Sequence, residues 1–109
     1  MLGWLKKKAA QQSLFNVELN TACLIVDASR ADAALVASGG QTNPADINRV
    51  KKSQQALLND IGLAIANGAT LEDVQARINK VRAKHPSNQG ADMAIVHVLQ
   101  YASRAVQAY

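Results

Sequence analysis

Apolar residues recur every three or four positions along most of the chain, which is the spacing of amphipathic α-helices. Glycine and proline interrupt this spacing at 39–44, at Gly68 and at 86–90, and so divide the chain. Sustained alternation of apolar and polar residues is absent, so no strand is predicted. The pattern predicts four helices at about 13–38, 44–67, 71–85 and 90–107, preceded by an N-terminal extension over residues 1–12.

The predicted fold is all-α: a four-helix up-and-down bundle with a short N-terminal helical extension, either separate from or continuous with the next helix, in a single domain of 109 residues. Short connections at 68–70 and 86–89 favour antiparallel neighbours. Residues with helix-capping side chains precede three of the helices: Asn43, Thr70 with Asp73 three residues later, and either Ser87 or Asn88.

The 13–38 helix differs from the other three because it carries two apolar stripes. Each of the others has one stripe, the usual pattern for a helix that packs on a bundle core. One stripe of the 13–38 helix consists of Phe15, Leu19, Ala22, Val26, Ala33 and Ala37. The nearly opposite stripe consists of Val17, Leu24, Ala28, Ala31 and Leu35. Either this helix is central in the domain, or one stripe faces another chain.

Two surfaces are candidate protein interfaces. The first is the second stripe of the 13–38 helix, where we expect a second copy of the chain or another protein to cover Val17, Leu24, Ala28 and Leu35. The second lies opposite the apolar stripe of the last helix and consists of Met93, His97, Tyr101 and Arg104. Methionine, tyrosine and arginine are enriched at interfaces. In the alternative interpretation of this second surface, Met93 and Tyr101 cover a neighbouring helix.

Basic residues make nucleic acid an alternative partner. The net charge is +4, and the bases form two groups: Arg49, Lys51 and Lys52 on the second helix, and Arg77, Lys80 and Lys84 on one face of the third. Such a face suits a phosphate backbone. However, Asp73 lies on the same face as the second group, and aromatic residues do not interleave with the bases. A solvated face is the simpler interpretation.

The N-terminal segment suggests a second alternative, peripheral association with a membrane. It combines apolar and basic side chains: Leu2, Trp4, Leu5, Lys6, Lys7 and Lys8. Tryptophan suits the headgroup level of a bilayer, and lysine suits anionic lipid. In the simpler interpretation, Trp4 docks on the bundle and the lysines are solvated. The longest apolar run is far shorter than the roughly 20 residues needed to span a bilayer.

No catalytic, cofactor-binding or metal site is predicted. Cys23 is the only cysteine, and its apolar neighbours suggest a small core residue. His85 and His97 are far apart and lack acidic partners at helical spacing, which makes a poor metal site. A single cysteine and the absence of a signal peptide favour the cytoplasm.

We therefore expect a non-enzymatic protein-interaction module: a small accessory, adaptor or inhibitor protein. A homodimer through the 13–38 helix is one form of this hypothesis. Nucleic-acid binding through the basic helix faces and membrane association through the N-terminal segment remain the alternatives.

Overall fold

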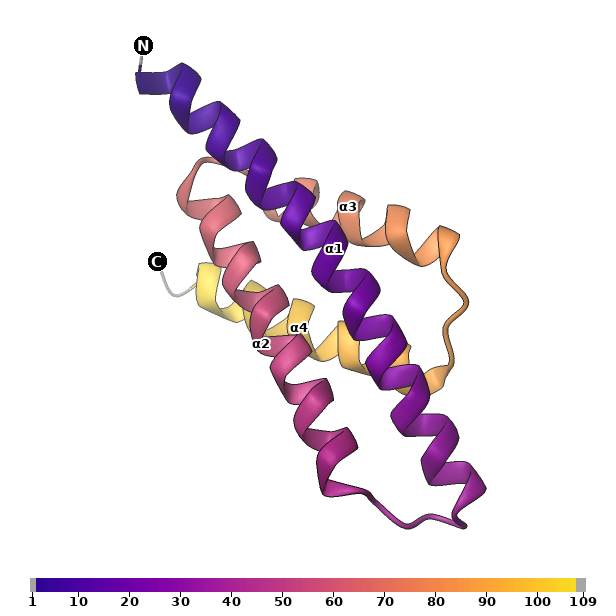
Figure 1. Cartoon of the computed structure of the whole chain (residues 1–109). Coiled ribbons are helices and arrows are strands. Elements are labelled where there is room, and N and C mark those ends of the chain that lie inside the picture. Colours follow the sequence, from indigo (N-terminus) through magenta and orange to yellow (C-terminus); the bar gives the residue numbers. More distant parts are fainter. Residues whose placement is uncertain (1, 108–109) are drawn as a thin grey trace.

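The computed structural model describes the backbone of residues 2–107 and the side chains of residues 3–106. This part of the chain forms four helices and no strand, which confirms the predicted all-α helical bundle. The helices are α1 (Leu2–Ala37), α2 (Pro44–Ala66), α3 (Leu71–Lys84) and α4 (Gln89–Gln107). Successive helices run in opposite directions, and α3 and α4 cross behind the antiparallel pair of α1 and α2 (Figure 1).

The N-terminal extension is not a separate element, because α1 begins at Leu2 and continues without a break to Ala37. Alanine, leucine, lysine and glutamine predominate in its first turns, and all four favour a helix. At 1.5 Å per residue, 36 residues make a helix about 54 Å long. The longest dimension of the molecule is 56 Å, so α1 extends along almost all of it.

The other helix ends follow the predicted local signals. The side chain of Asn43 accepts a hydrogen bond from the backbone N–H of Ala45, and Thr70 and Asp73 form a reciprocal capping box. Asn88 caps α4 by accepting from the N–H of Ala91 at 3.1 Å. The φ angle of Gly68 is +99°, a left-handed conformation that glycine adopts without strain and that ends α2.

The core lies where α1 meets the other three helices. The most extensive contact is between α1 and α2, and α1 also packs against α3 and α4. The largest fully buried side chains come from all four helices and include Leu24, Ile25, Leu57, Ile61, Ile78 and Ile95. Each helix therefore gives its apolar stripe to one shared core, and α1 is the element common to the main contacts.

The structure corrects the interface prediction for α1. Val17, Leu24 and Ala28 are buried inside the chain, and Leu35 is half-buried, so this stripe is occupied by α1's own neighbours. The opposite stripe is exposed instead: Phe15, Leu19 and Val26 have 51%, 52% and 43% of their surface accessible. One of the two stripes is therefore exposed, but it is not the stripe that was selected as the candidate interface.

None of the four described helices is long and apolar enough to cross a membrane.

Candidate functional site

A groove between the C-terminal halves of α2 and α4 forms a large apolar hollow on the described part of the molecule. Its volume is about 510 Å³. Its lining is apolar apart from one tyrosine hydroxyl: Leu58, Ile61, Gly62, Ile65 and Ala66 from α2, and Tyr101, Ala102, Ala105 and Val106 from α4. We call this hollow the α2–α4 groove. Volumes of about 300–1,000 Å³ are typical of binding pockets.

A second hollow of about 480 Å³ continues the groove toward the N-terminal ends of the two helices. Leu58 and Tyr101 line both hollows, so the two form one surface. The further lining residues of this polar part are Lys51, Gln54, Gln55, His97 and Val98. From Lys51 to Ile65 the α2 wall is about 21 Å long at 1.5 Å per residue.

A hydrogen bond connects the two helices at the polar part of the groove, and a glycine leaves open space at the apolar part. The side-chain amide of Gln54 donates a hydrogen bond to the backbone carbonyl of Ala94 at 3.1 Å. Beyond this bond, Gly62 lies in the α2 wall, and nothing comes within 4 Å of the position that a Cβ would take there. The missing side chain of Gly62 therefore keeps this part of the groove wide.

The groove is lined by basic side chains and, among the described residues, by no acidic ones. Lys51 and His97 line its polar part, and none of the described residues that line either part carries a carboxylate. The apolar part has no charged lining residue. A complementary ligand would therefore be apolar over most of its length and negative at one end.

The structure brings half of the predicted α4 surface to this groove. His97 and Tyr101 line it, and Tyr101 is 62% exposed on its rim. Met93 and Arg104 are exposed on α4 and do not belong to the lining. The alternative interpretation, in which Met93 and Tyr101 cover a neighbouring helix, does not fit because both side chains are more than half exposed.

Sequence reasoning missed the α2 wall of the groove. The single apolar stripe of α2 was expected to pack on the core, but of its members Leu58, Ile61 and Ile65 only Ile61 is fully buried. Gly62 was the available signal of this wall. A glycine within a helical pattern destabilises the helix by about 1 kcal/mol relative to alanine, so its presence there calls for a reason.

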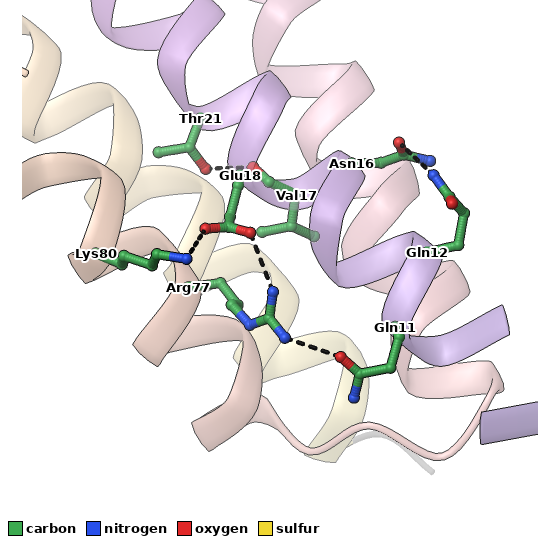
Figure 2. A network of polar contacts seen from close by, with 8 residues as sticks. All are labelled: Gln11, Gln12, Asn16, Val17, Glu18, Thr21, Arg77 and Lys80. Carbon is green, nitrogen blue, oxygen red and sulfur yellow. Dashed lines mark hydrogen bonds and ion pairs between the residues drawn. The ribbon is translucent and has the colours of Figure 1, made fainter. Parts of the chain in front are cut away.

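The bases of α3 are engaged by a carboxylate of α1, as Figure 2 shows. Arg77 and Lys80 each lie 3.0 Å from a carboxylate oxygen of Glu18, and Arg77 also donates to the side chain of Gln11 at 2.9 Å. The hydrogen bond from Lys80, followed by that from Arg77, lowers the pKa of Glu18 against the opposing effect of partial burial. This network joins α1 to α3 and reduces the positive charge that α3 presents to a phosphate backbone.

The remaining basic residues predicted to bind nucleic acid do not share one surface. Arg49 pairs with Asp46 at 3.0 Å, and Lys51 lines the polar part of the groove. Lys52 and Lys84 are exposed on α2 and α3 respectively. The structure therefore distributes the six bases among an ion-pair network, a groove and open surface.

The side chains of Trp4 and Leu5 project from the first turns of α1 and do not dock on the bundle. Trp4 and Leu5 are 61% and 55% exposed, and Lys6, Lys7 and Lys8 are exposed. The ammonium group of Lys8 lies 4.5 Å from the centre of the Trp4 ring, a cation–π distance. The side chain of Leu2 lies outside the described residues.

The cysteine and the two histidines lie on different elements. Among the described residues, no three His, Cys, Asp or Glu side chains gather as metal ligands. Cys23, expected in the core, is exposed on α1 beside the exposed stripe. His85 and His97 are both exposed, the first at the end of α3 and the second on the groove.

Comparisons with protein-family models, with curated proteins and with solved structures give no match to this chain.

Proposed function

We propose that the chain is a non-enzymatic protein-interaction module that binds one amphipathic helix of a partner protein in the α2–α4 groove. The continuous groove, with its uncharged apolar part and its basic polar part, carries the proposal. An amphipathic helix in an apolar groove is a recurrent mode of peptide recognition. Cys23 is an exposed free thiol, which fits the reducing environment of the cytoplasm, and we propose that location.

The length of the groove sets the length of the partner helix and the spacing of its apolar residues. A wall about 21 Å long matches about four turns of helix, which bring apolar residues at positions i, i+4, i+7 and i+11 onto one face. The partner also carries glutamate or aspartate at the end that meets Lys51, because no carboxylate of the described lining neutralises that lysine. Tyr101 supplies an amphipathic side chain on the rim, a type enriched among binding hot spots.

A displayed library of helical peptides tests this proposal. Apolar residues are fixed at the four positions above, two glutamates are fixed at one end, and all other positions vary. Selection is run against the wild-type chain and against Gly62→Arg, whose side chain enters the groove. We expect selected peptides to bind wild type and to bind Gly62→Arg at least roughly tenfold more weakly, as for loss of one buried apolar anchor.

The matched control is Ala83→Arg, which adds the same charge at an exposed position on α3. It should leave peptide affinity unchanged. Gly62→Arg should also raise the melting temperature slightly, because the substitution removes a helical glycine where no atom lies within 4 Å. Failure to enrich any peptide, or equal affinity for wild type and Gly62→Arg, would contradict the proposal.

A further inference from the structure

The exposed stripe of α1 forms an outward ridge that the groove hypothesis does not use. Its apolar members are Trp4, Leu5, Phe15, Leu19 and Val26, each between 43% and 61% exposed. From Trp4 to Val26 the ridge is about 33 Å long. In Figure 1, α1 lies in front of α3 and α4, and no other described helix crosses its near side.

The charges along α1 are divided between its two sides. All three carboxylates of the helix bind its neighbours: Glu18 pairs with α3, Asp27 accepts from the Ser53 hydroxyl of α2 at 2.5 Å, and Asp32 accepts from the N–H of Gly90 at 3.4 Å. The charged residues at the helical spacing of the outward ridge are Lys8 and Arg30, both exposed, whereas Lys6 and Lys7 line a hollow with Asp73 on another side of α1. The ridge is thus apolar and purely basic.

This charge distribution bears on which partner covers the outward ridge. In a parallel dimer through the ridge, Lys8 would face Lys8 and Arg30 would face Arg30. In an antiparallel dimer centred on Leu19, Lys8 of one copy would face Arg30 of the other. Both arrangements place like charges opposite each other, which is unfavourable for a second copy.

An anionic lipid surface satisfies both properties of the ridge. A helix lying in the membrane interface buries an apolar face with Trp, Phe and Leu, and its Lys and Arg side chains contact anionic headgroups. We propose that the chain docks peripherally on anionic membranes through the outward ridge of α1.

Vesicle binding tests the proposal, with unilamellar vesicles of phosphatidylcholine and phosphatidylserine compared with vesicles of phosphatidylcholine alone. Trp4 is the only tryptophan, so its fluorescence reports the ridge directly. We expect co-flotation with the anionic vesicles only, accompanied by a blue shift of Trp4 emission. The double variant Phe15→Gln/Leu19→Gln should bind roughly tenfold or more weakly, because it removes two apolar anchors.

Matched controls show whether vesicle binding depends on the ridge or on exposed apolar and basic residues in general. Met93→Gln changes an apolar residue of α4 that is 52% exposed, as Leu19 is, and should leave vesicle binding unchanged. Lys8→Gln/Arg30→Gln should abolish the preference for anionic vesicles, whereas Lys52→Gln/Lys84→Gln, with the same change in charge, should retain most of it. Gly62→Arg should bind vesicles as wild type does, so that the ridge and groove proposals fail separately.

Three results would overturn the proposal. The first is absence of binding to anionic vesicles, and the second is binding that the ridge variants leave intact. The third is a concentration-dependent dimer, detected by sedimentation, that the Phe15→Gln/Leu19→Gln variant dissociates. That last result would assign the ridge to a second copy of the chain. Binding of a synthetic acidic helical peptide to the ridge without vesicle binding would likewise replace lipid by protein.

Discussion

The inner and outer faces of α1 have almost the same apolar pattern, but the inner face is buried and the outer face is exposed. Val17 and Leu24 on the inner face have no accessible surface, whereas Leu19 and Val26 on the outer face are 52% and 43% exposed. Periodicity alone cannot choose between two such stripes, because each has helical spacing. The flanking charges do distinguish them, since the carboxylates of Glu18, Asp27 and Asp32 border the inner face and bind the other three helices.

The largest expected effect comes from truncating the same side chain on the two faces. Leu24→Ala leaves a cavity in the core and should reduce the free energy of unfolding by about 3 kcal/mol. Leu19→Ala, on the outer face, should reduce it by less than about 0.5 kcal/mol. Urea denaturation monitored by circular dichroism measures both values. Similar losses for the two variants would mean that the outer face is covered in solution.

The second effect concerns the close contact between α4 and the inner border of α1. A Cβ added at Gly90 would lie 2.7 Å from the Cβ of Asp32, an atom that cannot rotate away. Gly90→Ala should therefore destabilise the protein by about 1–3 kcal/mol through overpacking. Gly62→Ala is the control and should instead stabilise α2 by about 0.5–1 kcal/mol. Thermal unfolding should move the two melting temperatures in opposite directions.

Glu18 provides the third test, on the border between α1 and α3. Glu18→Gln removes two ion pairs, of which that with Lys80 is largely solvated, and should cost about 1 kcal/mol at neutral pH. The pKa of Glu18 is lowered in the folded state from its usual value of 4.5. Its contribution is therefore complete above pH 4.5 and is lost as the pH falls through the folded-state pKa. Unfolding measured from neutral to acidic pH should show the difference between wild type and Glu18→Gln shrinking below pH 4.5, and a constant difference would contradict the ion-pair explanation.

The smallest effect is expected on the outer face. Phe15→Gln replaces a side chain that is 51% exposed and should change the free energy of unfolding by less than about 0.5 kcal/mol. The same denaturation experiment measures it in the absence of lipid. A larger loss would indicate that Phe15 stabilises the folded monomer, and would weaken its assignment to a docking ridge.

The helix boundaries were predictable because they depend on residues close to each other in the sequence. The capping residues Asn43, Thr70 and Asn88 and the terminating Gly68 act within a few residues, so they revealed the helix boundaries and the helical class. The sequence pattern left open whether residues 1–12 form a short extension or continue the next helix, but helix propensity continues through them and α1 is unbroken.

The surfaces depend on contacts between distant segments, which periodicity does not encode. The groove lies between segments about forty residues apart, where Gln54 donates to the carbonyl of Ala94 and Gly62 leaves open space. The engagement of Arg77 by Glu18 joins residues 59 positions apart. Tyr101 and His97 could be found as exposed interface-type residues, but their partners across the groove on α2 could not.

The dominance of the α1–α2 contact has a consequence for the order of folding. These helices are joined by the six residues 38–43, so their contact closes a short loop, whereas docking of α4 on α1 requires the intervening helices to be placed first. We expect the α1–α2 hairpin to constitute the folding nucleus. Conservative truncations at Leu57 should then slow folding, and those at Ile95 should mainly accelerate unfolding, a partition that stopped-flow kinetics would measure.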